Sequence, residues 1–177
     1  MAGEFLTDVE TLRRRAREHI ERGAVTDAYG ADRDRVIAVL NEVLATELVC
    51  VLRYKRHYYC AQGINAGSVA AEFLQHATDE MGHADTVAAR IVQLQGAPNF
   101  SPDGLATRSH AEYVEGDGLL DMIKEDLVAE RVAIASYQEI VRWLGDGDPT
   151  TQQMIKGILA VEEEHAEDLA TLLESMS

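Results

Sequence analysis

The chain repeats one spacing of glutamate and histidine, and this repeat constrains its fold more than any other feature. Each copy has a lone glutamate followed, about one long helix later, by a Glu-x-x-His run. The copies consist of Glu47, Glu80 and His83, and then of Glu130, Glu162 and His165. Positions i and i+3 lie on one face of a helix, so both residues of a run can reach one ion. The repeat therefore predicts four helices that bring four carboxylates and two imidazoles together.

Both lone glutamates lie in apolar stretches of the sequence. Residues 43–52 read VLATELVCVL around Glu47, and residues 127–134 read LVAERVAI around Glu130. A buried carboxylate without a partner costs several kcal/mol. A buried ion pair, for instance with Arg53 or Arg131, is one explanation, and a metal site is the other. The presence of two matched copies favours the metal site.

The predicted ligand set suits two metal ions. Carboxylate oxygens combined with imidazoles fit iron or Mn(II), with Zn(II) as a substitute, and the same set occurs in di-iron carboxylate helical bundles. We expect Glu80 and Glu162 to bridge two iron ions, with one further glutamate and one histidine on each ion. The second nitrogen of each histidine needs an acceptor. Asp126, one turn before Glu130, is a candidate, and a simple exposed aspartate is the alternative.

Apolar residues at steps of three and four predict four long helices, at residues 32–62, 68–95, 118–144 and 149–174. The segment 98–116 between the second and third helices is too long for a helical hairpin. It indicates the long crossover of an up-down-down-up bundle. We therefore expect an all-α four-helix bundle at residues 32–177. It follows an N-terminal leader at residues 1–31 that contains a short helix at residues 11–22.

Composition disfavours several classes of protein. The formal net charge is −15, from 31 acidic and 16 basic residues, which argues against DNA binding. The sequence contains no signal-peptide core and no apolar run of membrane-spanning length, so we expect a cytoplasmic protein without membrane contact. Cys50 and Cys60 would lie about 15 Å apart on one helix, too far to bridge each other. A Cys-x-x-Cys pair for a zinc or rubredoxin-type site is absent from the sequence.

A tyrosine follows each lone glutamate at the same distance, Tyr54 after Glu47 and Tyr137 after Glu130. Two helical turns separate each pair, so each tyrosine shares a face with its glutamate. A tyrosine beside a metal pair can donate an electron or hydrogen-bond a ligand. The alternative is a packed tyrosine with a satisfied hydroxyl, which we prefer for Tyr137.

The remaining histidines carry weaker signals. His76 lies one turn before Glu80 and could guide incoming iron, but we expect it to be a surface histidine. His19, His57 and His110 have no ligand partners at a useful spacing.

The residues around the first Glu-x-x-His run carry a family resemblance. The segments Asp79–Asp85 (DEMGHAD) and Ile91–Asn99 (IVQLQGAPN) resemble bacterioferritins, in the ferritin-like superfamily. The resemblance covers residues 34–173 and includes all six predicted ligands. It implies a ferritin-like bundle, a tyrosine beside the di-iron centre at Tyr54, and ferroxidase activity. In that activity Fe(II) is oxidised by O₂ or H₂O₂, and the ferric product is stored in a protein shell.

Two features depart from the bacterioferritin pattern. Only residues 166–177 follow His165, so we do not expect the fifth helix that bacterioferritins use in building 24-subunit cages, and the leader is longer than theirs. Both features resemble Dps-like proteins, which implies a homo-oligomer of 12 subunits rather than 24. Met81 stands where bacterioferritins place a haem-binding methionine. A methionine on a helix flank is ordinarily a packing residue, so bound haem b is the less favoured expectation.

Two other functions stay open beside iron storage. One is a solitary di-iron peroxidase or oxidase of the rubrerythrin kind, although the four-cysteine rubredoxin domain of a rubrerythrin is missing from this sequence. The other is a Dps-like stress-protection protein, for which the acidic composition weakens the case for DNA binding. The size of the native assembly separates a storage cage from a solitary enzyme.

Overall fold

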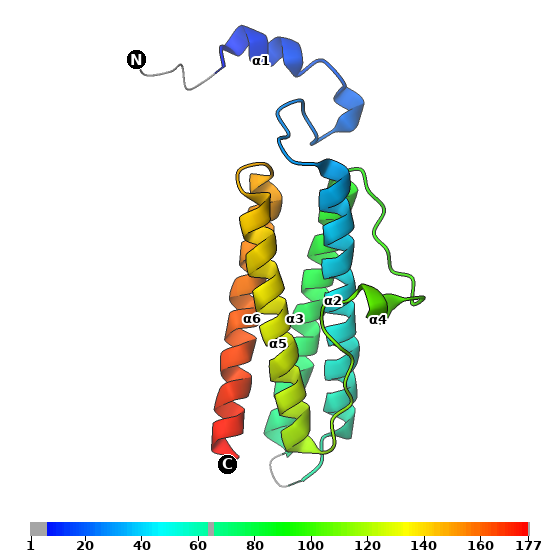
Figure 1. The fold of residues 1–177 in the computed structure, drawn as a ribbon, viewed down its shortest axis with the longest axis vertical. Coiled ribbons are helices and arrows are strands. Elements are labelled where there is room, and N and C mark those ends of the chain that lie inside the picture. Colours follow the sequence, from blue (N-terminus) through cyan, green and yellow to red (C-terminus); the bar gives the residue numbers. More distant parts are fainter. Residues whose placement is uncertain (1–6, 64–65, 177) are drawn as a thin grey trace.

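The computed structural model describes residues 7–63 and 66–176. Within these residues all regular secondary structure is helical (Figure 1). Four long helices form the bundle: α2 (Arg33–Cys60), α3 (Ala66–Gln93), α5 (Leu119–Leu144) and α6 (Pro149–Ser175). Three short helices lie outside it: α1 (Val9–Arg15), the 3₁₀ helix η1 (Ile20–Arg22) and α4 (Leu105–Arg108).

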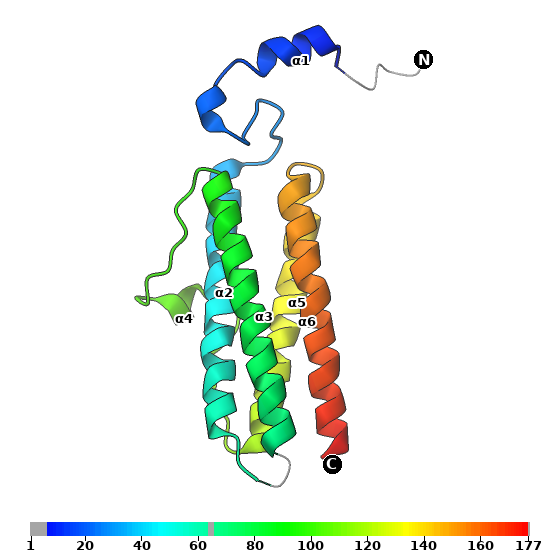
Figure 2. The same ribbon diagram turned by 180° about the vertical axis from the view of Figure 1, so that it is seen from behind.

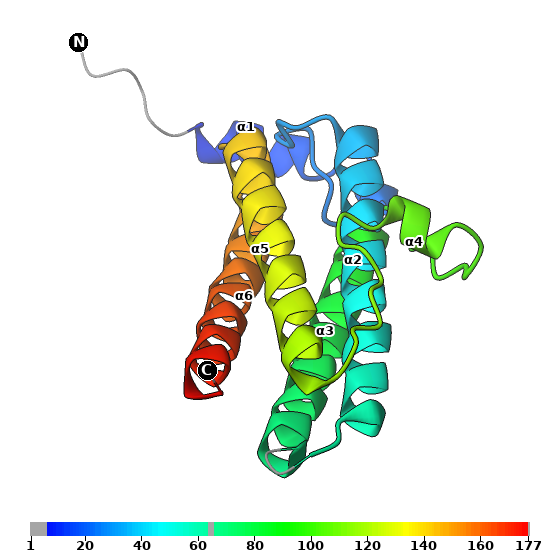
Figure 3. The same cartoon turned by 60° about the horizontal axis from the view of Figure 1, so that its bottom comes forward.

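The long helices run in the predicted up-down-down-up order. α2 and α3 form one antiparallel pair, and α5 and α6 form the other (Figures 1 and 2). The crossover from α3 to α5 returns along α2 and carries α4 on one side of the bundle, as Figure 3 shows. The predicted all-α four-helix bundle, with its long connection between the second and third long helices, is confirmed.

Local signals place the ends of the long helices close to their predicted positions. Asp32 caps α2 by accepting a hydrogen bond from the Arg35 N–H at 3.2 Å, and Asp148 caps α6 by accepting one from the Thr151 N–H at 2.9 Å. Gly145 follows α5 with a φ of 48°, a left-handed conformation that glycine adopts without a steric penalty.

The N-terminal leader differs from the prediction of one helix at residues 11–22. α1 ends at Arg15, and His19 takes a left-handed conformation with a φ of 53°, which interrupts the helix. The described part of the leader, residues 7–31, lies beyond the end of the bundle at which α2 begins (Figure 1). It is joined to the bundle by a hydrogen bond of 2.9 Å, which the Tyr29 hydroxyl donates to the Asp148 carboxylate.

Two apolar clusters fill the bundle on either side of a polar middle layer. The cluster nearer the leader includes Leu40, Leu44, Ile91, Tyr137 and Ile155. The other cluster includes Tyr54, Phe73, Ile123 and Leu169. Each fully buried aliphatic or phenyl side chain of this size contributes roughly 1.5–3 kcal/mol. These clusters hold the four helices in the register that brings the polar layer together.

Polar side chains of α2 hold the crossover against the bundle. The Asn41 side-chain oxygen accepts a hydrogen bond from the Asn99 N–H at 2.7 Å, and the Thr46 hydroxyl accepts one from the His110 N–H at 2.9 Å. Backbone groups outside helices need such partners when they are shielded from water. The crossover is therefore fixed along α2, and the start of α5 is fixed with it.

A buried charged group joins α2, α5 and the crossover. Asp126 on α5 accepts a hydrogen bond of 2.6 Å from Arg53, and its other oxygen lies 2.8 Å from Nδ1 of His57. All three side chains are fully buried, and Arg53 also donates to the carbonyl oxygen of Glu112 at 3.0 Å. Both predictions for Asp126 were therefore wrong, because it is neither exposed nor placed behind a predicted ligand. Arg53 pairs with Asp126 and not with Glu47.

The two cysteines are free, and Cys50 is buried whereas Cys60 is exposed. Burial raises the pKa of the Cys50 thiol, which keeps it protonated. Within residues 7–63 and 66–176, no helix has the length and apolar character needed to cross a membrane.

Replacing Arg53 with methionine should destabilise the bundle strongly, because the Asp126 carboxylate would stay buried without its main partner. We expect the free energy of unfolding of the metal-free protein to fall by about 3–5 kcal/mol, as for other broken buried ion pairs. Arg56→Met is the matched control, because Arg56 pairs with a largely exposed Glu115 and should cost about 1 kcal/mol or less. Urea denaturation measures both losses. Equal losses in the two variants would contradict this account of the buried group.

Candidate metal centre

All six predicted ligand residues meet in the polar middle layer of the bundle. Every long helix contributes to them: Glu47 from α2, Glu80 and His83 from α3, Glu130 from α5, and Glu162 and His165 from α6. The four glutamates are at most 1% exposed, and His165 is 3% exposed. Carboxylates gathered at such burial require compensating protons or cations.

The ligand atoms form two overlapping groups, and within each group they lie no more than 4.8 Å apart. The first group contains Glu47, Glu80, His83 and Glu162, and the second contains Glu80, Glu130, Glu162 and His165. Glu80 and Glu162 belong to both groups, whereas each group has one glutamate and one histidine of its own. Two ions that share two bridging carboxylates would need this arrangement.

His83 faces the centre through one ring nitrogen. Its Nδ1 lies 3.1 Å from an oxygen of Glu162, 3.3 Å from one of Glu47 and 3.6 Å from one of Glu80. Burial opposes the charge on this ring, but the three carboxylates outweigh burial and raise the pKa of His83 to about 12. In the metal-free protein this ring carries a proton at neutral pH, in the place where a cation would bind.

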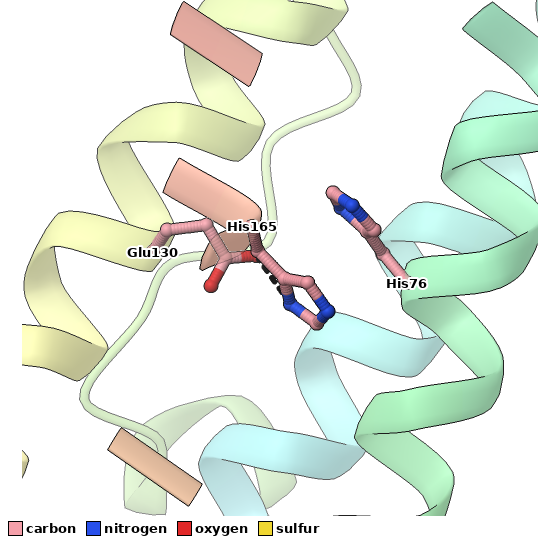
Figure 4. Close-up of side chains that lie close together, drawn as sticks. All are labelled: His76, Glu130 and His165. Atoms are coloured by element: carbon pink, nitrogen blue, oxygen red, sulfur yellow. Dashed lines mark ion pairs between the residues drawn. The ribbon is translucent and has the colours of Figure 1, made fainter. Parts of the chain in front are cut away.

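His165 has the same relation to the second group. Its Nδ1 lies 3.4 Å from Glu162, 3.7 Å from Glu80 and 4.0 Å from Glu130, the last of which Figure 4 shows as a dashed line. Burial again opposes the charge, and the carboxylates of Glu162 and Glu80 outweigh it, so the pKa of His165 is raised to about 11. The two histidines thus present matching nitrogens to the two groups.

Asp79 supplies the outer partner of one of these histidines. Nε2 of His165 lies 3.5 Å from the Asp79 carboxylate, which also accepts a hydrogen bond of 3.0 Å from Gln75. A carboxylate behind a metal-binding histidine fixes the orientation of the ring. The sequence pattern had indicated Asp126 as this partner and not Asp79, although Asp79 directly precedes Glu80.

Several carboxylate oxygens in the centre have no hydrogen-bond partner. These buried atoms are Oε1 of Glu80, Oε2 of Glu130 and both oxygens of Glu162. A buried oxygen without a partner costs free energy, and coordination of a divalent cation by oxygen and nitrogen atoms removes that cost. The donor set therefore fits two transition-metal ions better than it fits a network of internal hydrogen bonds.

Repulsion between the carboxylates changes their proton affinity. Burial, followed by the neighbouring Glu80 carboxylate, raises the pKa of Glu47 to about 8. Burial, followed by Glu80 and Glu162, also raises the pKa of Glu130 well above its usual range. The metal-free centre therefore retains protons on carboxylates as well as on histidines at neutral pH.

Hydrogen bonds from two tyrosines cross between α2 and α5. Tyr54 on α2 donates to Glu130 on α5, and Tyr137 on α5 donates to Glu47 on α2. Both tyrosines are fully buried, and burial raises the pKa of each phenol, so both keep their protons. Tyr137 does have a satisfied hydroxyl, but its partner is a glutamate of the centre. Simple core packing is therefore an incomplete description of Tyr137.

His76 is buried, which contradicts the prediction of a surface histidine. Its ring stacks on that of His165, with centroids 3.9 Å apart and 19° between the planes (Figure 4). Its Nδ1 lies 3.2 Å from the hydroxyl oxygen of Tyr54. Burial, and then His165, lowers the pKa of His76 to about 3, so the ring is neutral at neutral pH. The spacing of one turn from Glu80 was the only sequence signal for this inward position.

Met81 and the other histidines lie outside the two ligand groups. Met81 is 40% exposed on α3. His57 pairs with the buried aspartate of α5. His19 lies in the exposed leader, and His110 lies on the crossover beside α2. Among the described residues, the two overlapping groups together contain the six predicted ligands and no other residue.

Comparison with known proteins agrees with this architecture. A family model of the ferritin-like domain matches residues 37–177. The chain is 29% identical over 139 residues to a bacterioferritin of Rhodobacter capsulatus. This alignment covers 77% of this chain and 81% of the relative. The chain is also 32% identical over 145 residues to a bacterioferritin of Brucella melitensis. That alignment covers 81% of this chain and 85% of the relative.

Solved structures show the same fold. A bacterioferritin-related protein from Bacteroides fragilis, described as a dodecameric thioferritin, superposes with a TM-score of 0.80 at 31% identity, over 83% of this chain and 89% of that chain. Dps from Thermosynechococcus elongatus superposes with a TM-score of 0.76 at 19% identity, over 79% of this chain and 90% of that chain, and supports the fold alone. The chain therefore belongs to the ferritin-like domain family, with bacterioferritins among its relatives.

Proposed function

We propose that the protein is a ferroxidase that stores and detoxifies iron. The proposal depends on one observation, the two ligand groups that share Glu80 and Glu162 and can hold two Fe(II) ions side by side. Two Fe(II) ions supply two electrons, which together with two protons reduce O₂ to H₂O₂ or H₂O₂ to water, and two Fe(III) ions remain. The bacterioferritin relatives support storage of the ferric product.

The residues of the centre have distinct tasks in this proposal. Glu80 and Glu162 would be ligands of both ions, and one further glutamate and one histidine would hold each ion. The hydrogen bonds from Tyr54 and Tyr137 orient the two lone glutamates. Asp79 orients one of the histidines. Bound iron supplies the change of oxidation state. Mn(II) can occupy the same ligands, and so can Zn(II), which has no redox chemistry and would not support the reaction.

We assign this function to residues 32–177 of a cytoplasmic protein and treat residues 1–31 as a helical leader. Haem b at Met81 is the less favoured addition, because it needs a second subunit placed across a two-fold axis to complete the axial ligation. DNA binding is not part of the proposal, since the net charge of −15 opposes it.

We infer a closed homo-oligomer, with 12 subunits favoured over 24. A ferric mineral needs an enclosed cavity to stay dispersed, and closed shells form from repeated symmetric contacts. The relative from Bacteroides fragilis, 31% identical and described as dodecameric, supports this number. A solitary di-iron peroxidase or oxidase is the alternative function, for which no shell is required.

Metal binding should release protons. Glu47, Glu130, His83 and His165 have raised pKa values in the metal-free protein, so Zn(II) ions must displace about four protons per subunit at neutral pH. Because protons on the two histidines compete with the metal below pH values of about 12 and 11, the Zn(II) affinity should decrease as the pH falls, and more steeply below about 8, the pKa of Glu47. Calorimetric titrations in buffers of different ionisation enthalpy count the protons. A heat of binding that does not depend on the buffer would contradict this prediction.

Replacing Glu162 with alanine should abolish the fast phase of Fe(II) oxidation while the protein stays helical. The substitution removes a shared ligand from both groups, and it also removes a buried charge, so the metal-free variant should not be less stable than the parent. Glu163→Ala is the matched control, because Glu163 is exposed on the same helix. Stopped-flow absorbance after mixing with oxygenated buffer measures the rate. A parental rate in Glu162→Ala would refute the assignment of the centre.

The native mass should correspond to a closed shell. Twelve subunits of 19.5 kDa give about 234 kDa, which light scattering coupled to size exclusion can measure. A monomer or a dimer would instead favour the solitary di-iron enzyme. A particle of twice the expected mass with a haem absorption band would favour a bacterioferritin-type cage with Met81 as axial ligand.

A further inference from the structure

A second set of metal-binding side chains lies one helical turn outside the centre. Glu72 and His76 are an i,i+4 pair on α3, so they share a face, and Asp168 approaches them from α6. Nε2 of His76 lies 3.6 Å from an oxygen of Glu72 and 3.9 Å from an oxygen of Asp168. One ligand atom from each of the three residues lies within 4.8 Å of the others. We call these three residues the outer group.

Nε2 of the His76 imidazole faces the outer group without a hydrogen-bond partner. His76 is 1% exposed, and its Nε2 is a buried atom that no neighbouring group satisfies. The Tyr54 hydroxyl donates its single proton to Glu130. The Tyr54 oxygen can then only accept, so Nδ1 of His76, at 3.2 Å, carries the ring proton.

This tautomer leaves a lone pair on Nε2 of His76 facing two carboxylates. Neither Glu72 nor Asp168 offers a hydrogen when it is ionised, so three electron-rich atoms face one another. A divalent cation resolves this arrangement, because carboxylate oxygens and a neutral imidazole nitrogen are its ordinary ligands. The geometry, together with the unsatisfied nitrogen, therefore points to a cation.

The outer group connects solvent to the centre. The side chains of Glu72 and Asp168 are 38% and 47% exposed, whereas that of His76 is 2% exposed. His76 also belongs to a second group, in which ligand atoms of His76, Glu130 and His165 lie within 4.8 Å of one another, the residues drawn in Figure 4. Glu130 and His165 are in turn part of the centre. Ligand atoms thus continue without interruption from the surface to the proposed di-iron site.

We propose that Glu72, His76 and Asp168 form a third divalent-cation site, which collects Fe(II) and passes it to the centre. This inference rests on the proposed ferroxidase function. An ion with bonds of about 2.1 Å brings neighbouring ligand atoms to roughly 3 Å from each other, so the carboxylates must move inward by less than about 1 Å. Both are partly exposed and can make this movement. Three protein ligands leave positions for water, so the site releases its ion more readily than the centre does.

The test is the double variant Glu72→Gln/Asp168→Asn, which removes two charges from the outer group and leaves the centre intact. The matched control is Asp85→Asn/Glu167→Gln, which removes one charge from each of the same two helices at exposed positions. Zn(II) titration calorimetry should find three ions per subunit in the parent and in the control, one for each group at the centre and one for the outer group. It should find two in the test variant.

The kinetics of Fe(II) oxidation then test whether the outer group delivers Fe(II) to the centre. In the test variant the Fe(II) concentration that gives half the maximal oxidation rate should rise about tenfold, as expected when a focusing negative site is removed. The maximal rate should stay at the parental value, and the control should match the parent in both respects. Two Zn(II) ions in the parent, or unchanged Fe(II) dependence in the test variant, would overturn this inference while the ferroxidase function stands. Binding of no Zn(II) by the parent would instead remove the proposed function itself.

Discussion

Four buried carboxylates that repel one another are the constraint on which the rest of this structure depends. Two unit charges 4 Å apart interact with about 4 kcal/mol at an effective dielectric constant of 20, so the four glutamates cannot all be ionised without compensation. In the metal-free protein this compensation comes from protons on the two histidines, His83 and His165, and on Glu47 and Glu130, as their raised pKa values indicate. Two divalent ions in the proposed centre would replace these protons and satisfy the oxygens that lack hydrogen bonds.

The bundle holds these carboxylates in place through interactions that cross between α2 and α5. The hydrogen bonds of the two tyrosines are reciprocal. The tyrosine on α2 donates to the lone glutamate on α5, and the tyrosine on α5 donates to the lone glutamate on α2. Farther along the same helices, Arg53, His57 and Asp126 form a buried charged group that also holds the crossover. The polar centre is therefore braced by polar contacts between helices that are not joined by a short loop. The two apolar clusters close the bundle on either side of it.

Periodicity predicted the four helices and their order, because apolar spacing and capping residues are local properties of the sequence. The repeat also predicted which six residues would meet, since a Glu-x-x-His run has only one geometry on a helix. Contacts between helices were less predictable. The spacing of Tyr54 places it on the same helix face as Glu47, but its hydroxyl donates a hydrogen bond to Glu130 on a different helix. Asp79 and His76 were missed or misplaced for the same reason, because their partners lie on α6 and a single helix pattern does not reveal them.

We propose an arrangement in which two ions bind between the four helices and share Glu80 and Glu162. Anomalous diffraction at the iron edge, from crystals loaded anaerobically with Fe(II), tests it most directly. We expect two peaks in the centre about 3.5–4 Å apart, the separation usual for two-metal sites. One peak should lie against Glu47 and His83, and the other against Glu130 and His165. A single peak, or ions bound only away from these side chains, would contradict it.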